Sequence, residues 1–466
     1  MAPVETLTKR VKQFWHSDAA LRARLVNVGH LLTGNLVGSI VGILGFLATA
    51  RALGAADYGV LALTYSYVRV VGLLVGFQSW QPLIKYGAEV VGPERSDAYR
   101  SLLKFGLLID VAAALSSYLV AIGFAVMFGP LVGIGETAIE QVVIYSTVLL
   151  FQIAGLPTAV LRLAGRFRLV AYGSVIGGAV RLILCIVGLL ADMDVYYFVI
   201  AWALSQIIGS LVLLGLAVHE LRRQGIRNLL AAPFAGVTRR FKGLWTFTIG
   251  SNIELTVRSS ANEFDTLLVG MLTDPTGAGL YHIAKRLGRL ILQIGVQVQA
   301  VLYPDVARLW AQGEISLFRR TVRQTEIMLG VFGVAVVGAT AIGIGPLLAL
   351  AVGPEFADAG LLAIVQMAAV AMTLNGSVMR TALLAMGRQL VVLRIMFVAT
   401  LAFYAIALTM IPWIGPMGAN IAHVVMGCVW LTGLTQSFRS ALTAQGHGAR
   451  VQISASAGEL AQSPDL

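Results

Sequence analysis

The sequence predicts an all-α integral membrane protein with twelve transmembrane helices. The composition is the first reason. Hydrophobic residues make up 58% of the 466 residues and charged residues only 12%, and the mean hydropathy is +0.82. Soluble domains carry about 25% charged residues. The second reason is that the apolar residues gather into stretches of about 20 residues, which as helices cross a hydrocarbon core about 30 Å thick.

Continuous apolar stretches of this length favour helices over strands. Lipid-exposed backbone must make its hydrogen bonds within the protein, which leaves helices or closed barrels. The strands of a membrane barrel are shorter and alternate in hydrophobicity. The predicted spans are residues 28–50, 59–82, 104–128, 140–161, 170–191, 195–217, 246–272, 279–302, 325–352, 360–385, 391–412 and 416–437.

The distribution of Lys and Arg predicts the orientation. Away from the interior of the spans, these residues gather in the first segment and in alternate loops, and Arg51 is the exception on the opposite side. Loops rich in Lys and Arg are cytoplasmic in multi-pass proteins. We therefore expect a bacterial inner-membrane protein with both termini in the cytoplasm. Topology and anionic headgroups, and not nucleic acid, then account for the net charge of +11.

The two halves of the chain form predicted repeats. When the spans of the first half are laid on those of the second, Gly59 corresponds to Gly279 and Arg69 to Arg289. Each half has an even number of spans, so the repeats are parallel and are expected to enclose a central lumen. The predicted domains are a cytoplasmic N-terminus (1–27), a first lobe (28–217), an amphipathic helical linker (218–245), a second lobe (246–438) and a cytoplasmic tail (439–466).

Charged residues inside the spans are the candidates for function. An Arg or Lys that faces lipid at mid-depth costs about 2.5–3.5 kcal/mol, so such residues are expected to face a hydrated interior. Polar side chains recur at every fourth residue of the eighth predicted span, on one helix face: Tyr281, Lys285, Arg289, Gln293 and Gln297. Arg286 lies near the predicted periplasmic edge, where it can snorkel to the surface.

Tyr65 and Arg69 repeat this spacing in the second predicted span. We expect Arg69 and Arg289 to face the central cavity from opposite lobes, and at least one of them to bind an anionic group of a cargo molecule. A guanidinium group suits phosphate because its planar fork donates two parallel hydrogen bonds.

The other intramembrane charges leave two interpretations open. In the seventh predicted span, Glu254 and Arg258 are four residues apart and Asp265 follows on the same face. These residues either form a structural ion pair or contact the cargo. In the third and fifth spans, Asp110 either pairs with Arg181 or titrates as the acid that couples transport to an ion gradient.

The sequence contains no catalytic or metal-binding pattern. Neither a GxxxxGK(S/T) loop nor an HExxH motif occurs, and the connecting loops are too short to house a separate active site. Cys185 and Cys428 lie in predicted spans without neighbouring His or Cys. We therefore expect a transporter that uses neither a metal nor a cofactor, and not an enzyme.

Four short motifs resemble those of Wzx-type polysaccharide flippases, which share a superfamily with the MATE drug exporters. Residues 50–59 contain Arg51, Leu53, Gly54, Tyr58 and Gly59, similar to the family signature R-x-L-G-x-x-x-Y-G. The other three motifs are Asp265 with Gly270 and Gly279-Leu280-Tyr281, then Gly353-Pro354-Glu355-Phe356 with Ala359, and Gly415-Pro416-Met417-Gly418-Ala419.

The resemblance implies a MATE-like fold with a V-shaped lumen, alternating access, and undecaprenyl-diphosphate-linked oligosaccharide as cargo. The product would be O-antigen, capsule or exopolysaccharide, with a glycan polymerase and chain-length machinery as partners. Two alternatives stay open. A cation-coupled exporter of small molecules requires an acidic lumen, and a membrane glycosyltransferase or polymerase requires a large loop. The excess of basic residues inside the spans and the short loops favour the flippase.

Overall fold

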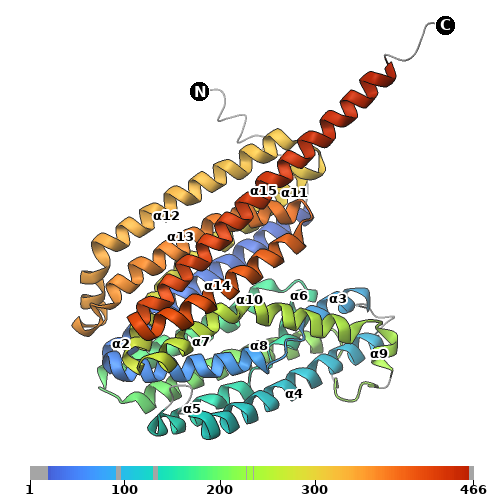
Figure 1. Ribbon diagram of the computed structural model, residues 1–466. Helices are drawn as coiled ribbons and strands as arrows, with labels where there is room; N and C mark the ends of the chain where they lie inside the picture. Colours follow the sequence, from blue (N-terminus) through green and yellow to red (C-terminus); the bar gives the residue numbers. More distant parts are fainter. Residues whose placement is uncertain (1–18, 91–95, 130–134, 227, 235, 461–466) are drawn as a thin grey trace, which may run out of the picture. The chain divides into compact units, whose positions relative to one another are not determined.

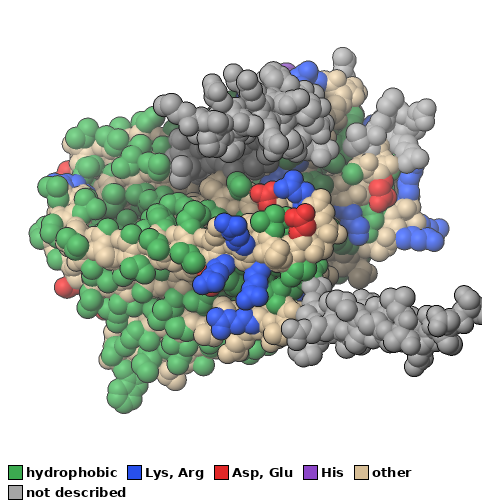
Figure 2. Space-filling view, turned by 90° about the horizontal axis from the view of Figure 1, so that it is seen from above, with side chains coloured by type: hydrophobic (Ala, Val, Ile, Leu, Met, Phe, Trp, Pro, Cys, Tyr) green, Lys and Arg blue, Asp and Glu red, His purple; other side chains and the backbone are tan. Residues whose placement is uncertain are grey.

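The computed structural model describes residues 19–90, 96–129, 135–226, 228–234 and 236–460, and these residues form helices joined by turns, without a strand (Figure 1). Ten stretches of helix in this part of the chain are long and apolar enough to cross a membrane. Large apolar side chains lie on their outer surfaces, with Trp413 87% and Ile342 86% exposed. Figure 2 shows one face where hydrophobic side chains cover a broad area. A broad apolar surface of this kind is typical of a protein that faces the lipid tails of a membrane.

The described chain forms two compact units. The first runs through Gly279 and includes Ala351–Gly353, and the second contains Leu280–Leu350 and the chain from Pro354 onward. The helices of the first unit are α2 (Ala19–Leu74), α3 (Trp80–Val90), α4 (Ser96–Phe128), α5 (Glu136–Leu150), α6 (Gly155–Leu163), α7 (Phe167–Leu190), α8 (Val195–Arg223), α9 (Val237–Arg240) and α10 (Leu244–Leu272). α11 (Pro275–Ala311) begins in the first unit, and the second unit holds α12 (Ile315–Ala351), the 3-10 turn η3 (Pro354–Phe356), α13 (Ala359–Ala385), α14 (Gln389–Ile414) and α15 (Pro416–Leu460).

The first two predicted spans are joined in one bent element, α2. Within it, the backbone of Gly54 leaves the helical conformation with φ 70° and ψ 178°. A Cβ atom would collide with the backbone in this conformation, so glycine adopts it at the lowest cost. The kink therefore separates two helical segments, in agreement with the two spans predicted to begin at residues 28 and 59.

α10 occupies the seventh predicted span but is not among the ten membrane-crossing candidates. Its 29 residues are long enough to cross, so composition sets it apart. Glu254, Arg258, Glu263 and Asp265 all lie on it. Ten candidates are found where twelve spans were predicted, because α2 contains two predicted spans and is counted once, and because α10 is too polar to be counted. The number twelve stays a prediction.

Two of the predicted spans are not continuous helices. The chain leaves the helical conformation between α2 and α3, inside the predicted span 59–82, and between α5 and α6, inside 140–161. Pro82 is the third residue of α3 and Pro157 the third residue of α6. Proline is tolerated in a first turn because the N–H that it lacks would have no partner within the helix. Both prolines therefore stand where a new helix can begin.

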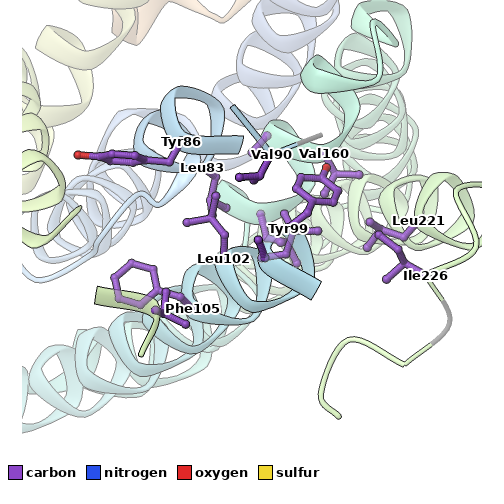
Figure 3. Packing of buried hydrophobic residues seen from close by; sticks show 14 of the residues in the cluster. Leu83, Tyr86, Val90, Tyr99, Leu102, Phe105, Val160, Leu221 and Ile226 are labelled. Atoms are coloured by element: carbon purple, nitrogen blue, oxygen red, sulfur yellow. The ribbon is translucent and has the colours of Figure 1, made fainter. Parts of the chain in front are cut away.

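A hydrophobic cluster packs the short helices α3 and α6 together with α4 and α8 (Figure 3). The labelled members are Leu83, Tyr86 and Val90 of α3, Tyr99, Leu102 and Phe105 of α4, Val160 of α6, Leu221 of α8 and the following Ile226. All are buried, so each of the two short helices is held by its apolar face. Their first residues are thereby placed close to α4.

The segment 218–245 does not form the single amphipathic helix predicted for the linker. α8 continues to Arg223, α9 has only four residues, and α10 begins at Leu244. Gly236, immediately before α9, has a φ of 83°. This left-handed conformation interrupts a helix, which corrects the prediction for the linker.

α10 belongs to the first unit, one helix beyond the boundary that the sequence predicts between the lobes. Its side chains bond to the end of α2 and to the break that follows. The hydroxyl of Thr256 donates to the carbonyl of Leu73 at 3.2 Å, and the amide oxygen of Asn252 accepts from the N–H of Gln78 at 2.7 Å. The division into functional lobes and terminal segments stays a prediction.

Gly59 and Gly279, which correspond in the predicted repeats, lie against each other in the first unit. A Cβ atom on Gly279 would come within 3.0 Å of the Cα atom of Gly59, and one on Gly59 would overlap the carbonyl of Pro275. The start of α11 therefore packs backbone to backbone on α2. Small residues permit such a close approach between membrane helices.

Candidate functional site

A cavity of about 430 Å³ lies in the first unit, between α2, α7, α8 and the end of α5. Its polar lining consists of Tyr65, Arg69, Gln152, Ser174, Arg181, Ser205, Gln206 and Ser210. We call it the arginine cavity. Of the residues predicted to bind cargo, the structure thus brings together Tyr65 and Arg69, and it adds Arg181.

Arg69 forms an ion pair on one side of this cavity. Its Nη2 atom lies 3.0 Å from Oε1 of Glu263 in α10. The side chain of Arg69 is 36% exposed and that of Glu263 only 14%, so the guanidinium is the more accessible partner. The Nε atom of Arg69 is buried and has no hydrogen-bond partner. Glu263 therefore orients the guanidinium but leaves it donors for a bound anion.

Arg181 is held by aromatic rings. The carbon of its guanidinium lies 4.5 Å from the centre of the Phe46 ring and 5.9 Å from that of Trp202. Trp202 is fully buried and donates a hydrogen bond from Nε1 to Oγ1 of Thr49 at 3.2 Å. Stacking on a fixed ring positions the planar group and leaves its full positive charge in place.

Asp110 of α4 bonds to the starts of the two short helices, and not to Arg181. Its Oδ1 atom accepts from the N–H of Ser79 at 3.2 Å, and its Oδ2 atom accepts from the N–H of Leu156 at 2.8 Å. The first N–H groups of a helix lack partners within it and carry the positive end of its dipole. One carboxylate thus caps α3 and α6 and does not pair with Arg181, whereas the alternative role of Asp110 as a coupling acid stays a prediction.

A second cavity, of about 250 Å³, lies between the two helix breaks. Its polar lining consists of Gln78, Trp80, Asp110, Ser117, Gln152, Thr158 and Arg162. We call it the Asp110 cavity. The guanidinium of Arg162 lies 4.8 Å from the centre of the Trp80 ring. Gln152 and Ala154 line both cavities, so the two are neighbours within the first unit.

The polar stripe predicted in the eighth span lies on α11 in the second unit. Its members are Tyr281, Lys285, Arg289, Gln293 and Gln297. Tyr281 and Lys285 are buried, and the other three are half-buried. Arg69 belongs to the first unit, so its predicted opposition to Arg289 stays a prediction, as does the contact of this stripe with cargo.

The charges of α10 have different surroundings. Asp265 is fully buried and accepts a hydrogen bond from the N–H of Thr266 at 2.6 Å. Glu254 is exposed. The side chain of Arg258 lies outside the described residues, so the Glu254–Arg258 pair stays a prediction, as does a contact of Arg258 with cargo.

Sequence reasoning missed Glu263 as the partner of Arg69 and missed both helix breaks. The breaks had a signal, because Gly76 and Pro157 interrupt apolar spans in the way typical of discontinuous transporter helices. Glu263 had none, because its pairing depends on how α10 packs against α2.

Two sequence comparisons identify proteins that are similar to this chain. The sequence profile of a family described as "Polysaccharide biosynthesis protein" matches residues 25–310. The inner membrane protein YghQ of Escherichia coli (strain K12) is 26% identical over 351 residues, which cover 74% of this chain and 97% of that protein.

Two solved structures share the fold. The lipid II flippase MurJ, in an inward closed conformation, aligns with a TM-score of 0.69 over 88% of this chain and 87% of its own, at 13% identity. An inward-facing multidrug resistance MATE family transporter of the MOP superfamily aligns with a TM-score of 0.65 over 89% and 96% of the two chains, at 14% identity. The predicted MATE-like fold is confirmed.

Proposed function

The chain belongs to the polysaccharide biosynthesis protein family, and on this premise we propose that it flips undecaprenyl-diphosphate-linked oligosaccharide repeat units across the inner membrane. The resemblance of its motifs to Wzx-type flippases agrees with the family and with the fold. Its relative in E. coli is an inner membrane protein, and the apolar helices make this chain a multi-pass one. The family and the fold support a flippase and not an enzyme.

The arginine cavity is the observation that carries the proposed cargo. Arg69 and Arg181 line one cavity, and each has a buried Nε atom without a hydrogen-bond partner. Glu263 balances one of the two charges, whereas Arg181 makes no ion pair in the described part of the chain. The cavity therefore has an excess of positive charge and donors in the planar arrangement that phosphate oxygens accept. A cationic drug would meet repulsion here.

The proposal also includes the direction of transport and the later use of the cargo. The cargo enters from the cytoplasmic leaflet, with both termini of the chain on that side, and leaves to the periplasmic leaflet. Rocking of the two halves exposes the site alternately. We also propose that Lys285 and Arg289 of α11 contact the cargo. A glycan polymerase and chain-length proteins then use the product.

A complementation experiment tests this function. A deletion strain receives the wild type, the double variant Arg69→Ala/Arg181→Ala, or the control Arg394→Ala, which changes an exposed residue of α14. Surface glycan and the lipid-linked intermediate in the cytoplasmic leaflet are measured at equal protein abundance. The wild type and the control should restore the glycan, and the double variant should leave the intermediate in the cytoplasmic leaflet.

Two other results would contradict the proposal. Full glycan in the double variant would remove the arginine cavity as the site for the diphosphate. Normal glycan in the deletion strain, together with increased sensitivity to cationic drugs, would instead support an exporter.

A further inference from the structure

We propose that the Asp110 cavity binds one sugar ring of the cargo, next to the diphosphate in the arginine cavity. This inference rests on the proposed function, because it assigns a second part of the same cargo to the neighbouring cavity. The residues of the Asp110 cavity would then distinguish a sugar-bearing lipid from a bare lipid diphosphate.

The two cavities are placed as the chemistry of such a cargo requires. Gln152 and Ala154, in the break between α5 and α6, line both of them. In a lipid-linked saccharide the first sugar is bonded directly to the diphosphate. A diphosphate held by Arg69 and Arg181 would therefore bring its first sugar to the next cavity.

The volume of the Asp110 cavity suits a single ring. It measures about 250 Å³. A pyranose ring with its hydroxyl groups fits into such a space.

The cavity contains polar groups without partners in the protein. Ser117 is 2% exposed, and its Oγ atom has no hydrogen-bond partner. The side chains of Gln152 and Thr158 also make no hydrogen bond within the described chain. A hydroxyl group both donates and accepts, and an amide offers one group of each kind. Sugar hydroxyls are the matching ligand for this set.

Asp110 and Trp80 complete the composition of a sugar site. Each carboxylate oxygen of Asp110 accepts one backbone N–H and keeps a lone pair for a further donor. Trp80 is fixed by a 3.1 Å hydrogen bond from its Nε1 atom to Oε1 of Gln78 and by stacking of Arg162. An aromatic ring packs against the C–H groups of a sugar, while the polar groups orient its hydroxyls.

A bare cation is a poorer occupant of this cavity. The N-termini of α3 and α6 both point their N–H groups at Asp110, and their dipoles already balance its negative charge. A cation that entered the cavity would be repelled by these helix ends. A neutral hydroxylated ring meets no such repulsion.

The helix breaks that form this cavity occur in only one of the predicted repeats. The helices of the second half at the corresponding places, α11 and α13, are continuous over their described length. Discontinuous helices line the binding sites of many transporters. The difference between the halves therefore assigns this part of recognition to the first unit.

Binding to the full-length protein in lipid nanodiscs tests the proposal. The ligands are undecaprenyl diphosphate alone and undecaprenyl diphosphate carrying glucose, galactose or N-acetylglucosamine, titrated by native mass spectrometry. At least one of the sugar-bearing lipids should bind the wild type about tenfold more tightly than the bare lipid, a difference of about 1.4 kcal/mol.

Variants of the cavity separate the sugar from the diphosphate. Ser117→Val and Trp80→Ala should each lower the affinity for the preferred sugar-bearing lipid until it equals the affinity for the bare lipid. The affinity for the bare lipid itself should not change. Trp80→Phe keeps an aromatic ring and should keep most of the preference. Trp413→Ala, which removes an exposed side chain of α14, is the control and should change neither affinity.

The outcomes distinguish this inference from the proposed function. If the wild type binds the bare lipid and all three sugar-bearing lipids equally, the sugar site is wrong while the function stands. If it binds none of these lipids, the proposed function itself is wrong. If Ser117→Val is folded and keeps the full preference for the sugar, the assignment of this cavity is overturned even where Trp80→Ala does not fold.

Discussion

The carboxylate of Asp110 in α4 accepts a hydrogen bond of 2.8 Å from the backbone N–H of Leu156, the second residue of α6. The same carboxylate accepts one from Ser79 at the start of α3. Asp110 is only 2% exposed, so its carboxylate lies inside the protein. One buried anion therefore joins two helix starts that are distant in the sequence and sets the wall of the Asp110 cavity.

Replacement of Asp110 should destabilise the protein according to the acceptors that remain. A buried N–H group without a partner costs about 1–3 kcal/mol, and two such groups lose their acceptor in Asp110→Ala, so this variant should lower the free energy of unfolding by about 2–6 kcal/mol. Asp110→Asn should cost less, because its amide oxygen accepts one of the two N–H groups. Thermal unfolding of the purified protein measures both. The control Asp305→Ala removes a surface ion pair and should cost less than about 1 kcal/mol. A wild-type Tm for Asp110→Ala would refute the capping role.

Gly155, the first residue of α6, leaves no room for a side chain. A Cβ atom there would lie 2.6 and 2.7 Å from the carboxylate oxygens of Asp110. Gly155→Ala should push α6 away from Asp110 and cost about 1–3 kcal/mol, with loss of most surface glycan. Gly123→Ala on α4 is the matched control, because no atom lies within 4 Å of its Cβ. Tm and surface glycan are the readouts, and equal behaviour of the two variants would count against the packing at Gly155.

The ion pair between Arg69 and Glu263 should be separable from cargo binding by a charge exchange. Arg69→Glu alone places two carboxylates side by side and should lower the Tm. The double variant Arg69→Glu/Glu263→Arg restores an ion pair and should recover at least half of that loss. It should still fail to bind undecaprenyl diphosphate, because the guanidinium then starts from α10 and not from α2. Recovery of binding together with the Tm would mean that Arg69 acts only through the pair.

The stacking of Arg181 should matter as well as its charge. Arg181→Lys keeps the positive charge but loses the planar group above Phe46, an interaction worth about 0.5–2 kcal/mol. The affinity for undecaprenyl diphosphate should fall about two- to thirtyfold, and further in Arg181→Ala. Titration of nanodisc-embedded protein measures this. The control Arg394→Lys on α14 should bind as the wild type does. Unchanged affinity in Arg181→Lys would show that charge alone suffices.

Helices that end where their apolar run ends could be predicted from the sequence, as at the C-terminus of α4. Such ends depend on local composition. The breaks before α3 and α6 could have been predicted from Gly76 and Pro157. They were missed because each lies within an apolar stretch that is long enough to be predicted as one continuous helix. The boundary at Gly279 could not have been predicted, because it depends on side chains of α10 that bond to α2 and to Gln78.

By itself the sequence determined that the chain lies in a membrane, that its spans carry Arg69, Arg181 and Arg289, and that its motifs resemble those of a flippase. Apolar length, charge and short motifs are local properties, so no fold is needed to read them. Only the tertiary structure decided the partners: Arg69 meets Glu263, Arg181 stacks on Phe46, and Asp110 caps α3 and α6. Inside a membrane protein, the nearest partner in space satisfies each buried charge, and the packing of helices determines which residue that is.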